Sequence, residues 1–211
     1  MSYDRLIEGH QRFKAQDFKT QSDQYQHLAK HGQNPKIMCI SCADSRVDPL
    51  AITQSGPGDV FAIRNVANLV PPWSEDQQKK CFSTEAALRY AVLHLRIEHL
   101  IVMGHAQCGG IRALVTDDPA SPSQDPIHQW VHHLGSAKQH VQQLYPDAND
   151  DTQACHCERQ GLICSQQHLI GYPFIAEKVS QNQLSIHLWH FDIATGQLET
   201  YDEASQSFVA L

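Results

Sequence analysis

The chain has 211 residues, of which 41% are hydrophobic and 18% charged, and its formal net charge is −7. This length and apolar fraction suit one compact domain, residues 1–211, with a sizeable core. Acidic side chains outnumber basic ones, and no Lys/Arg cluster forms a phosphate-binding stripe, so we expect no nucleic-acid partner. No stretch is long enough to span a bilayer, so we expect no membrane contact.

The first twenty residues are polar and contain no apolar segment typical of an export signal. We therefore expect a cytoplasmic protein, with enclosure in an organelle or microcompartment left open. In that setting the seven cysteines stay reduced, which favours metal binding or burial over a disulfide framework.

Residues 2–30 are polar with spaced apolar side chains, which predicts one or two amphipathic helices. We interpret residues 1–34 as a helical arm that packs on a partner subunit, and residues 35–211 as an α/β core. Within the core, hydrophobic periodicity predicts strands at 37–40, 60–63, 100–103, 184–191 and 198–201, and helices over 85–96, from about 111, over 127–144 and over 164–179.

Two segments that follow predicted strands carry side chains suited to a metal ion. Cys42 follows the strand at 37–40, and His105 and Cys108 follow the strand at 100–103. Two thiolates and an imidazole suit zinc, and three ligands leave one coordination position for water or substrate, as in a catalytic site. Taken singly, a buried cysteine or a core histidine would be the ordinary interpretation. Their shared position at strand carboxyl ends, where α/β sheets form ligand crevices, favours the metal site.

Four segments carry a likeness to a known family: Cys-Ala-Asp-Ser-Arg at 42–46, Arg-Asn-Val-Ala-Asn at 64–68, Tyr-Ala-Val at 90–92 and Gly-His-Ala-Gln-Cys-Gly-Gly at 104–110. They resemble the β-class carbonic anhydrases of the plant-like branch, from about residue 33 to the end of the chain. The resemblance implies a mostly parallel central β-sheet flanked by helices, with an N-terminal helical arm. It also implies one Zn²⁺ per chain on Cys42, His105 and Cys108, and a homodimer or dimer of dimers (homotetramer) with the active site at the dimer interface.

The resemblance further implies a substrate pocket. Gln33, Phe61, Val66 and Tyr90 match its positions, some of them contributed by the neighbouring subunit. We place Gly109 with this pocket, where it and the next glycine would let the backbone turn tightly under the metal. The alternatives are ordinary, because Phe61 and Val66 could be core residues and Gln33 a solvated loop residue.

The implied activity is reversible hydration of carbon dioxide to bicarbonate and a proton. Carbon dioxide is a weak electrophile, so the site must supply hydroxide at neutral pH, which a zinc-bound hydroxide provides. Asp44 can accept the hydrogen bond of that hydroxide and orient it, and Arg46 can hold Asp44 as a bidentate partner. Cys39 and Ser41 stand where bicarbonate-regulated bacterial members typically carry Trp and Gly. We therefore expect an open site with Asp44 paired to Arg46 and not bound to the metal.

Two alternatives stay open. Carbonyl sulfide or carbon disulfide hydrolysis would use the same zinc site, and a noncatalytic zinc-stabilised dimer could serve as a scaffold for a protein partner. None of the fourteen histidines is assigned as the proton shuttle. We expect Cys155, Cys157 and Cys164 to be buried or surface thiols and not a second metal site.

Overall fold

The computed structural model describes residues 2–76, 81–117 and 125–211. Its elements follow in chain order: α1 (Tyr3–Ala15), α2 (Asp17–His31), β1 (Ile37–Cys42), α3 (Pro49–Thr53), β2 (Val60–Asn65), η1 (Val66–Asn68), α4 (Phe82–Arg89), η3 (Tyr90–Leu95), β3 (His99–His105), α5 (Gly109–Thr116), α6 (Pro126–Val131), η4 (His132–Leu134), α7 (Gly135–Leu144), α8 (Asp150–Gly171), α9 (Pro173–Ser180), β4 (Ser185–Phe191), β5 (Leu198–Asp202) and β6 (Ser207–Ala210).

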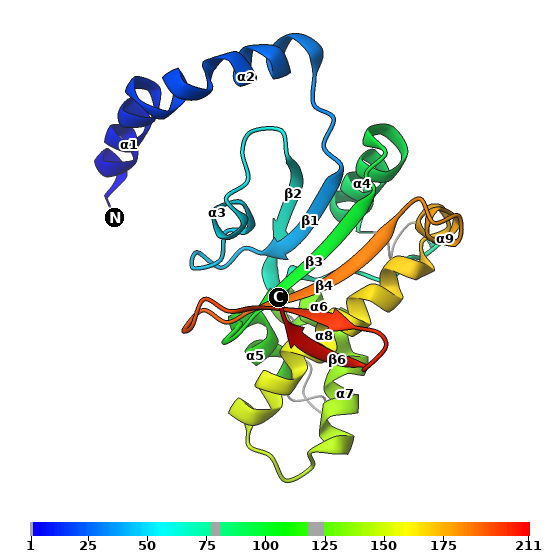
Figure 1. Cartoon of the computed structure of the whole chain (residues 1–211). Coiled ribbons are helices and arrows are strands. Elements are labelled where there is room, and N and C mark those ends of the chain that lie inside the picture. The colour runs from blue at the N-terminus through cyan, green and yellow to red at the C-terminus, as the bar shows by residue number, and fades with distance from the viewer. Residues whose placement is uncertain (1, 77–80, 118–124) are drawn as a thin grey trace.

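The strands form one sheet in the order β2-β1-β3-β4-β5-β6 (Figure 1). The strands β2, β1, β3 and β4 are parallel to one another, and β5 and β6 extend the sheet from β4 with antiparallel pairing. Because β1 and β3 are adjacent and parallel, their carboxyl ends lie side by side, and both predicted metal-binding segments begin there. The predicted α/β fold with a mostly parallel sheet is confirmed.

Alternate strand residues point to opposite faces of the sheet and meet different helices. Met38 and Ile40 belong to the larger core, which includes buried residues of η3, α8 and α9. Cys39 and Ile101 belong to a smaller cluster on the other face, with Ile52 of α3 packed against it. The metal-binding side chains therefore come from a sheet that has apolar residues packed against both of its faces.

The arm formed by α1 and α2 stands away from the body of the molecule (Figure 1) and has no buried residue in either helix. Its aromatic side chains contact one another, with the rings of Phe18 and Tyr25 5.2 Å apart. Where the arm approaches the core, the Gln24 amide donates to the Pro57 carbonyl at 2.7 Å. None of the described helices combines the length and the apolar character needed to cross a membrane.

Three predicted helices differ from the observed ones. The helix expected over 127–144 is divided into α6, η4 and α7, and the helix expected over 164–179 begins at Asp150 and ends at Gly171. Asn149 caps the start of α8 by accepting a hydrogen bond from the Thr152 amide. Pro173 then opens α9, because proline is tolerated in the first helical turn but disfavours helix in the residue before it. The third, expected over 85–96, starts at Phe82 as α4 and changes to a π-helical turn, η3, before Arg96.

Four of the five predicted strands run further than predicted, and β4 begins one residue later than predicted. β1 ends at Cys42 and β3 at His105, so two metal-ligand candidates are the last residues of strands and do not follow them. The short helix α3 and the edge strand β6 were not predicted. A ligand at a strand end is held by the ladder of its neighbours, which restrains its backbone more than a loop would.

Candidate metal centre

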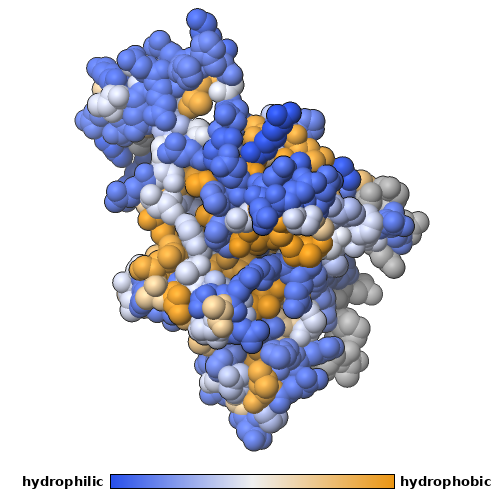
Figure 2. Space-filling model, turned by 45° about the vertical axis from the view of Figure 1, so that its right-hand side comes forward, coloured by the Kyte–Doolittle hydropathy of each residue, from blue (hydrophilic) through white to orange (hydrophobic). Residues whose placement is uncertain are grey.

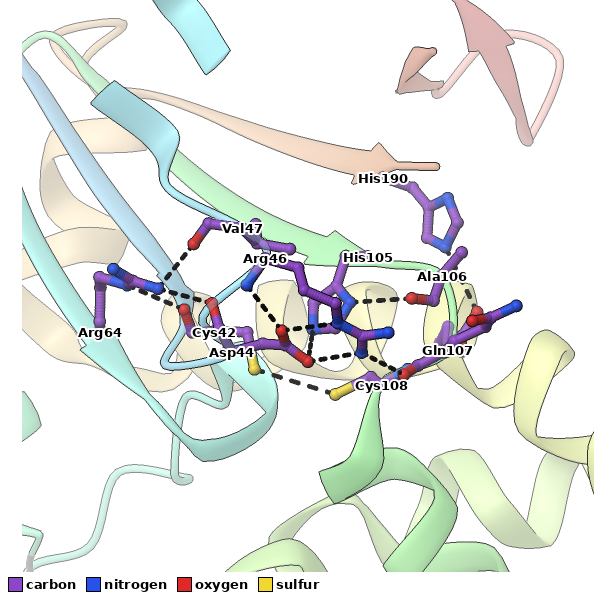
Figure 3. A network of polar contacts seen from close by, with 11 residues as sticks. Cys42, Asp44, Arg46, Val47, Arg64, His105, Ala106, Gln107, Cys108 and His190 are labelled. Carbon is purple, nitrogen blue, oxygen red and sulfur yellow. Dashed lines mark hydrogen bonds and ion pairs between the residues drawn. The ribbon is translucent and has the colours of Figure 1, made fainter. Parts of the chain in front are cut away.

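Cys42, His105 and Cys108 converge at the carboxyl ends of β1 and β3 (Figure 3). All three side chains are buried, and their sulfur and nitrogen atoms lie within 4.8 Å of one another. The two sulfurs are 3.9 Å apart. A tetrahedral zinc ion with zinc–sulfur bonds of about 2.3 Å holds two thiolates about 3.8 Å apart, so this spacing fits the ion without rearrangement.

His105 is oriented for metal binding by its own backbone. Its Nδ1 lies 2.9 Å from the Ala106 carbonyl, which can only accept a hydrogen bond, so the proton is on Nδ1. The Nε2 lone pair is then free, and this atom is buried without a hydrogen-bond partner among the described residues. A buried nitrogen with a free lone pair fits the role of a metal ligand, because buried polar atoms without a partner are otherwise rare.

The contact between the two thiols changes the pKa of each, and the lowered pKa of Cys42 favours cation binding. A hydrogen bond from the Cys108 thiol lowers the pKa of Cys42, and the same contact raises the pKa of Cys108. The backbone amides of Gly110 and Ile111, in the first turn of α5, oppose that rise. Metal binding requires deprotonated cysteines, so this arrangement supplies one thiolate near neutral pH and stabilises the second when a cation arrives.

Asp44 and Arg46 form a closely fitted pair beside these ligands. The Arg46 guanidinium donates to both carboxylate oxygens of Asp44, at 2.9 and 2.7 Å, and the Arg46 backbone amide donates to Oδ1 at 2.9 Å. These hydrogen bonds hold the pKa of Asp44 well below its usual range. Oδ2 is also 3.9 Å from Nε2 of His105. The carboxylate therefore lies next to the ligand cluster as an ionised acceptor whose orientation is fixed by Arg46.

Arg64 of β2 organises the turn that carries this pair, a role that sequence reasoning missed. Its guanidinium donates to the carbonyls of Cys42, Asp44 and Val47 at 3.0, 2.8 and 2.6 Å (Figure 3). One rigid side chain thus satisfies three carbonyls of the segment between β1 and α3. The segment 64–68 was singled out as a motif, but nothing in a single sequence shows which carbonyls an arginine will reach.

The expected reason for the two glycines after Cys108 is wrong in detail. Neither Gly109 nor Gly110 has a positive φ, and the left-handed residue of this turn is Gln107, with φ 57°. A Cβ on Gly109 would meet nothing within 4 Å, whereas one on Gly110 would lie 2.9 Å from Val66 Cγ1 and 3.0 Å from Ala67 Cβ. Gly110 therefore permits close packing of α5 against the turn after β2, and this packing brings Val66 against the first turn of α5.

The predicted pocket residues fall into separate groups within one chain. Val66 lies on the metal side, where its carbonyl accepts a hydrogen bond from the Trp130 indole at 2.8 Å. Phe61 and Tyr90 are together, with ring centroids 5.7 Å apart, but Phe61 pairs with Met38, four residues before Cys42 along β1.

Gln33 lies furthest from the metal ligands. It precedes β1, and Cys42 is the last residue of that strand. At about 3.3 Å per residue this strand is about 17 Å long, and Gln33 precedes its amino end. The structure does not bring Gln33 to the metal ligands of its own chain.

Glu158 is a second contributor that the sequence reasoning missed. This buried carboxylate of α8 accepts a hydrogen bond from the Cys108 backbone amide at 3.1 Å. Cys155 is exposed, and Cys157 and Cys164 are buried. Within residues 2–76, 81–117 and 125–211, no second group of three metal-ligating side chains places its ligand atoms within 4.8 Å of one another.

The comparisons with known proteins match this geometry. The carbonic anhydrase family model matches residues 37–198. The chain is 38% identical to beta carbonic anhydrase 5, chloroplastic, of Arabidopsis thaliana, over 90% of this chain and 61% of that relative. It is 33% identical to a carbonic anhydrase of Synechocystis sp., over 98% of this chain and 73% of the relative. The chain thus spans about three fifths of the length of the first of these relatives.

Solved structures show the same likeness in three dimensions. The β-carbonic anhydrase CcaA superposes with a TM-score of 0.91 at 33% identity, over 99% of this chain and 98% of that one. Tetrameric β-carbonic anhydrases of Sordaria macrospora superpose with a TM-score of 0.81 at 26% identity, over 94% of this chain and 95% of the other. Sequence, fold and the Cys-His-Cys cluster agree, and the chain belongs to the β-class of the carbonic anhydrase family.

Proposed function

We propose that this protein catalyses the reversible hydration of carbon dioxide to bicarbonate and a proton, at one zinc ion per chain held by Cys42, His105 and Cys108. The observation that carries the proposal is the Asp44–Arg46 pair beside the three ligands. A purely structural zinc site normally closes its tetrahedron with a fourth Cys or His. Here the neighbouring carboxylate is held by arginine, so a zinc ion on these three residues would keep a position for water or substrate.

Zinc bound at these residues would supply hydroxide at neutral pH, because the ion lowers the pKa of water. Asp44 then orients the attacking oxygen. As an ionised carboxylate it only accepts hydrogen bonds, so it would accept the hydrogen bond that the nucleophile donates and leave a lone pair of that oxygen toward the carbon of carbon dioxide. Arg46 keeps Asp44 in this position with two charge-assisted hydrogen bonds, and it also donates to the Gln107 carbonyl at 3.1 Å. The pair thereby joins the loop after β1 to the loop after β3.

The apolar side of the site is proposed to come from two copies of the chain. Carbon dioxide is uncharged, so a small apolar pocket suits it, and Val66, Phe61 and Tyr90 provide such surface. Val66 and Tyr90 are exposed in the single chain. In Figure 2 apolar side chains gather on the body of the molecule, next to the mostly hydrophilic arm. A homodimer would cover the exposed Val66 and Tyr90 side chains. It would also bring the Gln33 amide of one copy to the metal ligands of the other.

The test of the activity is stopped-flow hydration of carbon dioxide, followed with a pH indicator on protein of known zinc content. We expect fast proton release that is lost with a zinc chelator and restored by added zinc. Absence of proton release from fully zinc-loaded protein near neutral pH would reject the proposal.

The shared site is tested by complementation. Asp44→Asn and Gln33→Ala chains are each expected to be impaired, and random mixing of the two makes half of the dimers mixed. If Gln33 serves the partner's metal centre, one site in each mixed dimer is intact, and about a quarter of wild-type activity returns. No recovery in dimers shown to be mixed would place Gln33 in its own chain's site or outside the mechanism.

A further inference from the structure

Two ionisable side chains behind the metal centre have no part in the mechanism above, yet both are buried. The side chains of Glu158 in α8 and His190 in β4 are 4% and 2% exposed. Burial of such groups is costly unless they are paired or hydrogen-bonded. Neither ring nitrogen of His190 has a hydrogen-bond partner in the described part of the chain. Burying two ionisable side chains next to a metal centre is destabilising, so a functional explanation is sought.

The groups form a connected series that starts at a metal ligand. One oxygen of Glu158, Oε1, accepts the Cys108 backbone amide at 3.1 Å. Its other oxygen, Oε2, lies 3.5 Å from Nε2 of His190, and Nδ1 of His190 lies 3.6 Å from Oε2 of Glu199. Arg159 donates to the same oxygen of Glu199 at 2.7 Å, near the surface. His190 therefore stands between two carboxylates, one of which holds the backbone of Cys108.

We propose that Glu158 is a positioning residue of the metal centre, which fixes Cys108 through its backbone amide and is itself held in place by His190. The proposal rests on the proposed metal site, and it assigns a role to side chains on the far side of the ligand loop from Asp44.

The geometry of the ligand loop explains why such a residue is needed. Cys108 lies between Gln107, whose backbone is left-handed, and Gly109, where α5 begins. Because Cys108 is the N-cap residue, its amide N–H precedes the hydrogen-bond ladder of α5 and has no acceptor within that helix. Its amide would otherwise depend on water in a buried site, so the Glu158 carboxylate replaces water with a fixed acceptor. The His190 ring, 3.5 Å from the second oxygen, limits the rotation of that carboxylate.

The test compares Glu158→Ala with Glu158→Gln in the full-length, metal-loaded protein. Zinc affinity is measured by competition with a chromophoric chelator, and ligand geometry by the visible absorption of the cobalt-substituted protein. Loss of a side chain that supports a metal ligand typically costs about 10- to 100-fold in metal affinity or activity. We expect Glu158→Ala to lose zinc affinity in this range and to shift the cobalt bands. Glu158→Gln keeps an acceptor for the Cys108 amide and should lose less.

Glu85→Gln is the matched control, because Glu85 is also a buried carboxylate but pairs with Arg89 in its own helix. The proposal is overturned if Glu158→Ala keeps zinc affinity and the cobalt spectrum within the range of this control. If Glu158→Ala does not fold, His190 decides. His190→Gln can keep a donor toward Glu158 and should retain the spectrum, whereas His190→Phe cannot and should shift it; identical spectra would overturn the proposal.

Neither measurement depends on the reaction catalysed. A protein that binds zinc but does not hydrate carbon dioxide would reject the proposed function and leave this test intact.

Discussion

Replacing Gly110 with alanine should destabilise the protein by an amount that follows from its surroundings. A Cβ at this position would lie 2.9 Å from Val66 Cγ1, 3.0 Å from Ala67 Cβ and 3.3 Å from the Ala67 backbone nitrogen. Favourable carbon–carbon contacts begin at about 3.5 Å, so the two surfaces must separate by about half an ångström. Ala67 cannot easily yield, because its backbone is already left-handed, with φ 63°. Overpacking of this kind typically costs about 1–3 kcal/mol.

Gly109→Ala is the control, one residue away in the same helix. A Cβ at that position would meet no described atom within 4 Å, so alanine there should be neutral or stabilising by up to about 1 kcal/mol. Urea unfolding at fixed protein and zinc concentration measures both, because metal and subunit association shift apparent stability. For a chain of this size 1 kcal/mol moves Tm by about 2–4 °C. A Gly110→Ala protein as stable as wild type would refute the close approach of α5 to the turn after β2.

Three further predictions concern the metal centre. Asp44→Asn should keep one zinc per chain but lower kcat about 100-fold, because the amide can donate where a pure acceptor is needed; unchanged turnover would remove Asp44 from the mechanism. Cys42→Ser should lose zinc and activity while the dimer persists in sedimentation, and retained activity would refute this ligand. The Arg46 hydrogen bonds lower the pKa of Asp44 below its ordinary value of 3.8, so its stabilising contribution is present above about pH 4 and lost in stronger acid. In metal-free protein the stability advantage of wild type over Asp44→Asn should not decline between about pH 7 and 4 and should fall in stronger acid, and a decline near pH 6 would contradict this.

The strands were predictable because the buried parallel sheet leaves continuous apolar runs in the sequence. Residues 37–40 and 100–103 are such runs, and both are within observed strands. The long helix α8 was harder, because its buried residues include Glu158, Ser165 and Gly161 as well as apolar ones. A helix packed against several neighbours has no single apolar stripe, so periodicity alone found only its last part, residues 164–171.

The metal ligands could be predicted from the sequence because they follow predicted strands. The Asp44–Arg46 pair could be predicted because its two members are neighbours in the sequence. The remaining contacts join residues far apart in the chain. Glu158 reaches Cys108 across fifty positions, and Arg64 reaches the Cys42 carbonyl from the neighbouring strand. Such pairings depend on how elements pack, which a single sequence does not encode in any local pattern.

The positions of Cys42 and His105 at the ends of two adjacent strands give a bound ion a second effect. Any ion held by both would act as a crosslink between β1 and β3, closing the loop of chain that runs from residue 42 to residue 105. Closing such a loop reduces the conformational freedom of the unfolded chain, in the way that a disulfide does. The ion that serves the reaction would then also stabilise the sheet. Removing it would lower the free energy of unfolding as well as the activity.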